Sequence, residues 1–163
     1  MLLFLKNFLF TVFVPGSVAV FIPYRIVVRA DPGLVFAPWR LLWSAPLFLL
    51  GAGIYFWCLW NFAVTGRGTP APIDPPKRLV VRGLYRHVRN PMYLGVLLVV
   101  AAWAAVSGSG RVVEYGLGVA VVFHLFVVLV EEPLLRHRFG ASYEAYCRAV
   151  SRWLPGRAYR PAV

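Results

Sequence analysis

The chain has 163 residues, of which 60% are apolar and 14% charged, with a formal net charge of +11 and a mean hydropathy of +0.70. Soluble domains carry about a quarter charged residues and under half apolar ones, so this composition excludes an ordinary soluble globular protein. It also excludes a disordered chain, which would be far less hydrophobic. The length is typical of one domain, and two cysteines are too few for a disulfide scaffold.

Four apolar stretches follow one another along the chain. Each meets or approaches the roughly 20 residues that a helix needs to cross a bilayer. They are residues 2–22, interrupted by Lys6 and Pro15-Gly16, residues 41–64 without any charge, the short uncharged segment 91–107, and residues 112–130 with Glu114 near the start. The sequence therefore predicts an all-α integral membrane protein with about four transmembrane helices in a single domain, residues 1–163.

The first stretch has a second interpretation. Lys6, the apolar run after it and Ser17-Val18-Ala19 loosely resemble a secretory signal with its small-residue cleavage site. Because the charged region before the apolar run is weak, a retained membrane helix is favoured. A mature N-terminus after Ala19 would support the signal instead.

The third and fourth stretches are predicted to form an antiparallel hairpin, because residues 107–110 read Ser-Gly-Ser-Gly, a composition typical of a tight turn. Few ionisable groups interrupt the apolar stretches, and His124 is the main one. The polar residues gather instead at one end of the predicted hairpin. Since a proton-coupled exporter needs a carboxylate deep in the bilayer, this distribution favours chemistry at the membrane surface.

Basic residues set the expected orientation. If four helices cross the membrane, all but four of the 17 Lys and Arg residues fall on one side, and Arg25, Arg29, Arg40 and Arg111 fall on the other. Short loops rich in Lys and Arg remain in the cytoplasm, so both termini of this multi-pass protein are predicted to be cytoplasmic. The basic surplus indicates contact with anionic lipid headgroups. Nucleic acid is not an expected partner, because nothing in the sequence resembles a base-reading module.

The first polar cluster precedes the third stretch and contains Arg86, Arg89 and Asn90-Pro91. Asparagine before proline is a typical helix start, so Asn90 is expected to cap the free amides of a helix that begins at Pro91. A helix N-terminus favours an anion, and the two arginines add positive charge beside it. The alternative is that Asn90 only caps and that the arginines only contact lipid phosphate.

The second polar cluster is Glu131-Glu132-Pro133, at the end of the fourth stretch. Proline disfavours helical geometry in the residue before it, which predicts a break at Glu132 and a new helix from Pro133. The two carboxylates either complement the dipole of that helix or form a site for a positively charged ligand.

After Pro133, apolar residues recur at steps of four and three: Leu135, Phe139, Tyr143, Cys147 and Val150. This spacing predicts a C-terminal amphipathic helix in the plane of the headgroups, with a break at Gly140. Such a helix either covers the two polar clusters or anchors the chain to the membrane surface.

Several motifs share an order that is informative as a whole. They are Leu79-Val80, Gly83-Leu84-Tyr85, Arg89-Asn90-Pro91-Met92-Tyr93-Leu94-Gly95, Glu131-Glu132, Phe139-Gly140 with Tyr143 and Tyr146, and Leu154-Pro155. In this order and spacing, residues 66–155 resemble the isoprenylcysteine carboxyl methyltransferase and phospholipid methyltransferase superfamily of integral-membrane enzymes. Each motif is common by itself, so the resemblance depends on their combination around the predicted hairpin.

The resemblance implies a methyltransferase that binds S-adenosylmethionine near the cytoplasmic face. By the same resemblance, the residues that line this cofactor are Leu79, Val80, Tyr85, Asn90, Pro91 and Tyr93, with Glu131 binding its positively charged part and Glu132 in support. The chemistry of the residues agrees, because the cofactor carries a carboxylate that suits a helix start and an ammonium that suits the glutamates. No metal site is predicted.

The methyl acceptor is less well defined. A carboxylate or thiolate needs no base, whereas an amine must first lose a proton. The candidates for taking that proton are Glu132, His87 and His137. Prenylcysteine enzymes of the superfamily place an arginine about one turn before the Glu-Glu pair, where this chain has Val127. The resemblance therefore favours a phospholipid amine that enters from the bilayer, with its headgroup near Arg86 and Arg89.

Two other classes of function stay open. A membrane reductase of the sterol-reductase type shares this architecture in its C-terminal half but uses NADPH, and its aromatic-rich signature is not found here. The other class is a non-enzymatic scaffold or transporter subunit. Titration of the purified protein with S-adenosylmethionine and with NADPH separates the three hypotheses.

Overall fold

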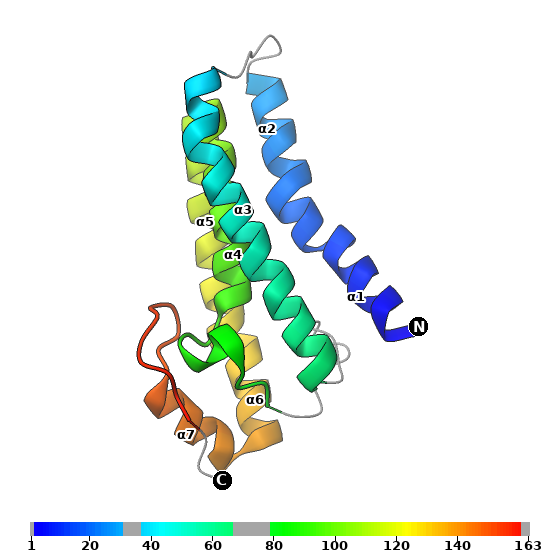
Figure 1. Cartoon of the computed structure of the whole chain (residues 1–163), viewed down its shortest axis with the longest axis vertical. Coiled ribbons are helices and arrows are strands. Elements are labelled where there is room, and N and C mark those ends of the chain that lie inside the picture. Colours follow the sequence, from blue (N-terminus) through cyan, green and yellow to red (C-terminus); the bar gives the residue numbers. More distant parts are fainter. Residues whose placement is uncertain (1, 31–36, 67–78, 161–163) are drawn as a thin grey trace.

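Helices make up the regular structure of this chain. The computed structural model describes residues 2–30, 37–66 and 79–160, and no strand occurs in these ranges. In chain order the elements are α1 (Leu2–Phe13), the π-helical turn η1 (Ser17–Phe21), α2 (Ile22–Ala30), α3 (Pro38–Asn61), the π-helical turn η2 (Phe62–Gly66), the 3-10 turn η3 (Gly83–Arg86), α4 (Pro91–Ser107), α5 (Gly110–Phe126), the π-helical turn η4 (Val127–Glu131), α6 (Glu132–Phe139) and α7 (Ala141–Ala149). The long helices stand side by side, and α7 lies across one end of them (Figure 1).

Within the described ranges, three helical segments are long and apolar enough to cross a membrane: Phe8–Ala30, Pro38–Val64 and Gly110–Phe139. Helix α4 is also apolar but shorter, with 17 residues. The chain is therefore an all-α integral membrane protein, as predicted.

The first helix ends later than the predicted segment 2–22, because α2 continues it and adds Arg25 and Arg29. The turn η1 begins directly after the Pro-Gly pair and lets the helix continue, and the Val18 carbonyl in this turn accepts a hydrogen bond from the Tyr115 hydroxyl on α5 (2.8 Å). Both arginines are exposed close to the end of the helix. Long basic side chains at such positions reach the membrane surface, which explains why the helix tolerates them.

Helices α3 and α4 pack with their backbones in contact at Gly51 and Gly95. A Cβ atom on Gly51 would lie 2.6 Å from the carbonyl oxygen of Gly95, and a Cβ on Gly95 would lie 2.8 Å from that of Gly51. Small residues allow this close approach, which is a common way for membrane helices to associate. The contact holds the first turns of α4 firmly against α3.

The predicted hairpin between α4 and α5 is confirmed. Helix α4 ends at Ser107, Gly108 adopts the left-handed conformation (φ 66°), and α5 begins at Gly110. The guanidinium of Arg40 donates a hydrogen bond to the Ser107 carbonyl (2.7 Å) and so satisfies one of the last carbonyls of α4.

The break predicted at Glu132 is wrong, since Glu132 is helical (φ −62°, ψ −44°) and one helical segment runs from Gly110 to Phe139. The π-helical turn η4 takes the place of the break. Its N–H donor at Glu132 bonds the carbonyl of Val127, five residues earlier. This turn absorbs the irregularity next to Pro133, and it directs Val127 and Glu132, which are 1% and 2% exposed, into the protein.

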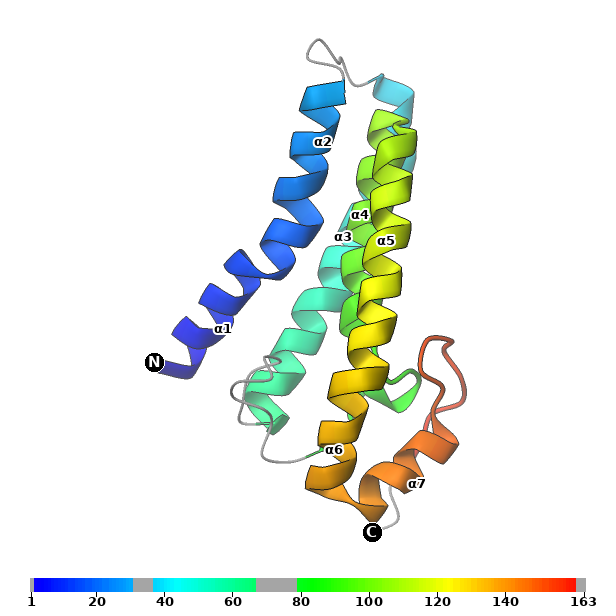
Figure 2. The same ribbon diagram turned by 180° about the vertical axis from the view of Figure 1, so that it is seen from behind.

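The amphipathic pattern after Pro133 marks the surface that the C-terminal part buries. The helix breaks at Gly140 (φ 50°, ψ −128°), as predicted. The cluster on this surface consists of Tyr143, Tyr146 and Val150, packed by Leu135, Phe139, Cys147, Leu79, Val81 and Tyr159. The apolar face of α7 is thus covered by other parts of the chain, and Figure 2 shows α7 turning back from the end of α6.

Candidate active site

The start of α4 and the end of the α5–α6 helix meet at one end of the hairpin. The Tyr93 hydroxyl donates a hydrogen bond to Oε2 of Glu131 (3.0 Å), and Arg89, just before α4, bonds Oε1 of Glu132 (3.1 Å). Helical side chains lean toward the N-terminus of their own helix, so on antiparallel helices Tyr93 and Glu131 lean toward each other. The structure thus brings together the two polar clusters of the sequence.

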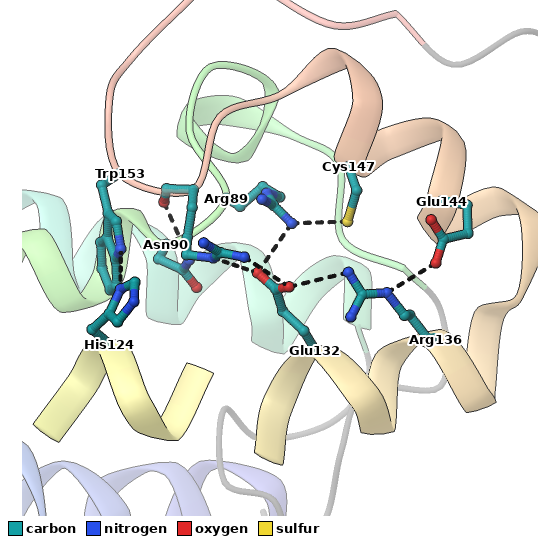
Figure 3. Close-up of polar contacts among 9 residues, drawn as sticks. Arg89, Asn90, His124, Glu132, Arg136, Glu144, Cys147 and Trp153 are labelled. Carbon is teal, nitrogen blue, oxygen red and sulfur yellow. Dashed lines mark hydrogen bonds and ion pairs between the residues drawn. The ribbon is translucent and has the colours of Figure 1, made fainter. Parts of the chain in front are cut away.

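Glu132 is a buried carboxylate surrounded by three arginines (Figure 3). Arg152 bonds both of its oxygens (2.6 and 3.1 Å), Arg89 bonds Oε1 (3.1 Å), and Arg136 bonds Oε2 (3.3 Å). Burial of a charge is tolerated only where ion pairs and hydrogen bonds compensate it, which these contacts do. The hydrogen bond to Glu132 also raises the pKa of Arg152. Both carboxylate oxygens of Glu132 are therefore engaged within the protein.

Two of these arginines also tie α7 to the site. Nε of Arg136 bonds Oε1 of Glu144 (2.9 Å), and Nη1 of Arg89 lies 2.8 Å from the Cys147 sulfur, as Figure 3 shows. The side chain of Arg89 is only 11% exposed. These contacts connect the loop before α4, helix α6 and helix α7 through a single carboxylate.

Glu131 has different surroundings from Glu132. Among the residues that the structure describes, its carboxylate has one polar partner, the Tyr93 hydroxyl, and no basic side chain pairs with it. The residue is half-buried. A carboxylate without a counter-ion next to a helix start is suited to a ligand that carries a positive charge.

Aromatic rings lie beside the Tyr93–Glu131 pair. The Tyr93 ring contacts Phe123 and Trp153, with centroid distances of 4.7 and 6.4 Å. The indole N–H of Trp153 donates to Nδ1 of His124 (3.1 Å; Figure 3). Because the faces of aromatic rings attract cations, these rings and the Glu131 carboxylate favour the same kind of ligand.

The segment after α7, residues 151–159, holds the loop that leads into α4, and we call it the C-terminal strap. Its backbone pairs with that loop through three hydrogen bonds of 2.9 Å: Arg89 N–H to Ser151 O, Gly156 N–H to His87 O, and Tyr159 N–H to Arg86 O. The order of these pairs makes the two segments antiparallel. The strap therefore fixes the backbone from which the predicted site residues project.

Helix α4 begins at Pro91 with Asn90 in the N-cap position, as predicted. The Asn90 side chain, however, makes no capping hydrogen bond and donates to the carbonyl of Arg152 in the strap (3.2 Å). The predicted capping by Asn90 is therefore wrong, because the strap provides a competing acceptor. The first amides of α4 consequently have no side-chain acceptor within the described residues.

The other predicted polar residues occupy different places. Nε of Arg86 donates to the carbonyl of Tyr159 (2.9 Å), and Nδ1 of His87 lies 2.9 Å from the carbonyl of Gly156, so both side chains also contact the strap. His137 is exposed on α6, and in the described part of the chain no contact joins it to the Tyr93–Glu131 pair.

The residues predicted to line the cofactor upstream of α4 are well packed. Val80 and Tyr85 are 5% and 7% exposed and form a cluster with Cys58 of α3, whereas Leu79 packs against the cluster of α7. The carbonyl of Tyr85 accepts a hydrogen bond from the Tyr146 hydroxyl (2.6 Å), and burial raises the pKa of the Tyr85 side chain. These residues support the base of the site at the start of α4.

Sequence reasoning missed Arg152 and Trp153, which contact the two halves of the site. The only available signal was their position directly before the Leu154-Pro155 motif. His124 stood out as an ionisable residue in an apolar stretch, but its contact with Trp153 depends on the path of the strap and has no counterpart in the sequence pattern.

The chain was compared with known protein families. The family model described as phospholipid methyltransferase matches residues 39–142, which is more than half of the chain and includes nearly all of α3, the helices α4 and α5, both glutamates and the start of α7. No solved structure matches the chain.

Proposed function

The chain belongs to the phospholipid methyltransferase family, and on this premise we propose that it uses S-adenosylmethionine to methylate the amine of a phospholipid headgroup. Its family and its long apolar helices make it a membrane methyltransferase. The observation that carries the finer proposal is the Tyr93–Glu131 pair, in which a carboxylate with no basic partner among the described residues lies beside the start of α4.

The residues of this site have the chemistry that S-adenosylmethionine requires. Glu131 would bind the ammonium of its methionine end, and the first amides of α4, after Asn90, would bind the carboxylate as helix N-termini bind anions. Tyr93 would orient Glu131 and contact the ligand with its ring. Leu79, Val80, Tyr85 and Pro91 would form the packed apolar base that supports this ligand site.

Glu132 receives a positioning role in this proposal. Because three arginines occupy its carboxylate, it holds the loop before α4, helix α6 and the strap at fixed positions around the ligand. Arg89, which is nearly buried, shares this role instead of contacting a lipid headgroup. Arg86 remains the candidate for contact with the phosphate of the acceptor.

The chemistry needs accurate placement more than it needs functional groups. When bound, S-adenosylmethionine supplies an activated methyl group that an acceptor lone pair displaces directly. The contribution of the protein is to hold that lone pair in line with the methyl group, and positioning of this kind supplies much of the rate. The rings of Tyr93, Phe123 and Trp153 would help by excluding water from the site.

The residue one turn before the glutamates favours an amine acceptor over a carboxylate. Val127, which is 1% exposed, stands where prenylcysteine enzymes have the arginine that holds a carboxylate. An amine must lose a proton before it attacks. The carboxylate of Glu132 is engaged, and His137 makes no contact with the Tyr93–Glu131 pair within the described residues, so His87, whose ring contacts the strap, is the remaining candidate to accept the proton.

The proposed acceptor enters from the bilayer, so the site should lie at the cytoplasmic headgroup level. The basic residues at this end would contact anionic lipids, and both termini would then be cytoplasmic. Figure 1 agrees with one side for the first and last helices, because α1 and α7 lie in the same half of the molecule.

Titration of the detergent-purified protein tests the proposal. We expect binding of S-adenosylmethionine and no binding of NADPH, followed by transfer of a radiolabelled methyl group to phosphatidylethanolamine in a total lipid extract. Binding of NADPH alone would support the reductase instead, and binding of neither would support a scaffold or transporter subunit. A label on a species other than an amine lipid would overturn the proposed acceptor.

A further inference from the structure

An apolar cavity of about 210 Å³ lies between the first helix and the α3–α4 pair. Gly16, Ala19 and Ala52 leave this space because their side chains are small, and Val96 and Val99 line it from α4. Figures 1 and 2 show that α1 diverges from α3 and α5 toward the end that carries the candidate site. The cavity lies where this divergence begins.

The lining suits a hydrocarbon and does not suit water. Its polar atoms include the hydroxyls of Thr11 and Tyr55, which lie 2.8 Å apart and hydrogen-bond each other. Cavities without unsatisfied polar groups stay dry. Val20 and Phe56 at its rim are 47% and 58% exposed, so the cavity opens sideways toward the bilayer.

Two residues that line the cavity, Val96 and Val99, follow Tyr93 on α4. With a rise of 1.5 Å per residue, Val96 and Val99 lie roughly 4.5 and 9 Å beyond Tyr93 along α4. Phe123 connects the two regions, because its ring contacts Tyr93 and also packs against the cluster that contains Val96 and Val99. A lipid whose headgroup lies at the level of the start of α4, next to the bound S-adenosylmethionine, therefore has its chains at the depth of the cavity.

We propose that this cavity binds one acyl chain of the phospholipid whose amine is methylated, an inference that rests on the proposed function. An apolar cavity of about 150 Å³ is large enough to bind benzene, so this larger one can hold a segment of an acyl chain. Binding of the chain fixes the depth and direction of the lipid and so places the headgroup amine at the site.

A second cavity provides a matched control. It is apolar and measures about 370 Å³. It lies between α3 and α4 at the end of this helix pair that is far from the candidate site, where Ala45 and Val106 line it. Val106 lies roughly 20 Å beyond Tyr93 along α4, too far for the part of a chain next to the headgroup. Ala45 and Ala52 are on the same helix, but each lines a different cavity. Enlarging Ala45 fills the control cavity, and enlarging Ala52 fills the proposed acyl-chain cavity.

The test compares Ala52→Leu with Ala45→Leu in the full chain. Methyl transfer is measured with dioleoyl phosphatidylethanolamine and with glycerophosphoethanolamine, which has the same headgroup and no acyl chain. We expect Ala52→Leu to lower the ratio of kcat/KM for the diacyl over the deacylated substrate by about tenfold, the effect of a misfit in a hydrophobic pocket. Ala45→Leu should leave this ratio unchanged. If Ala52→Leu does not fold, Ala52→Val provides the smaller change.

A binding measurement separates this inference from the proposed function. Phosphatidylethanolamine with a diazirine in its acyl chain should label peptides that contain Ala52 and Val96, and Ala52→Leu should reduce that labelling. An unchanged lipid ratio, or labelling only around Ala45 and Val106, would overturn the acyl-chain site. If the wild-type protein labels at the cavity but transfers no methyl group to phosphatidylethanolamine, the proposed function fails while the lipid site stands.

Discussion

Glu131 and Glu132 are adjacent in the chain, yet their carboxylates have different partners. Glu132 is bound by three arginines, whereas Glu131 accepts a hydrogen bond from the Tyr93 hydroxyl and pairs with no basic residue in the described ranges. Neighbouring helical residues point about 100° apart, which allows one to face the loop and the strap and the other to face α4. The two glutamates should therefore differ in function, and mutation can separate them.

Glu131→Gln should weaken the binding of S-adenosylmethionine without unfolding the protein. The amide keeps the shape of the side chain but loses the charge that would pair with the ligand ammonium, a loss of about 1–3 kcal/mol. Isothermal titration calorimetry on the purified variant measures the change. Glu114→Gln, an exposed glutamate near the start of α5, is the control and should bind as the wild type does. Equal affinities for both variants would remove Glu131 from the site.

Glu132→Gln should chiefly reduce stability. It leaves three guanidinium groups around a neutral amide, and breaking a buried ion pair in this way costs about 3–5 kcal/mol. Thermal unfolding in detergent, followed by circular dichroism, should show a clear fall in Tm. The matched variant Glu144→Gln removes only the exposed partner of Arg136, and a solvent-screened surface pair of this kind contributes little to stability. A loss of cofactor binding at unchanged Tm in Glu132→Gln would contradict the positioning role.

The meeting of Tyr93 and Glu131 could be predicted from the sequence, because the turn at residues 107–110 determines that the two helices are antiparallel neighbours. The start of α4 could be predicted as well, because it depends on a local residue type, the proline at its first position. The helical continuity at Glu132 could not be predicted in the same way. The rule for residues before proline favours a break, and a π-helical turn satisfies the backbone by another route.

The strap shows a second limit of sequence reasoning. Residues 151–159 have no helical or strand periodicity, and they are positioned by backbone hydrogen bonds to the loop before α4. Such bonds carry no side-chain pattern, so the ion pair of Arg152 and the ring contact of Trp153 were not foreseeable. The same bonds explain why Asn90 bonds the strap instead of capping α4.

Two variants of Tyr93 should separate its hydroxyl from its ring. Tyr93→Phe removes the hydrogen bond to Glu131 and should weaken S-adenosylmethionine binding by about 0.5–1.5 kcal/mol. Tyr93→Ala also removes the contacts with Phe123 and Trp153, which should lower stability by about 0.5–1.5 kcal/mol for each ring pair, and it should weaken binding further because the ring no longer contacts the ligand. Calorimetry gives the affinities, and Tm gives the stability. If Tyr93→Ala unfolds the protein, its ring serves packing more than binding.

Gly95→Ala should destabilise the protein and disturb the site from a distance. The added Cβ would lie 2.8 Å from the Gly51 carbonyl oxygen and 3.0 Å from the Tyr55 backbone nitrogen, so α3 and α4 must move apart. Overpacking of this kind costs about 1–3 kcal/mol. Since Tyr93 lies two residues earlier, the affinity for S-adenosylmethionine should fall together with Tm.

Gly118→Ala on α5 is the control, because its Cβ would meet no atom within 4 Å. Alanine favours the helix by up to about 1 kcal/mol over glycine, so this control should be neutral or stabilising. Equal Tm values for the two variants would show that α3 and α4 do not need their backbone contact.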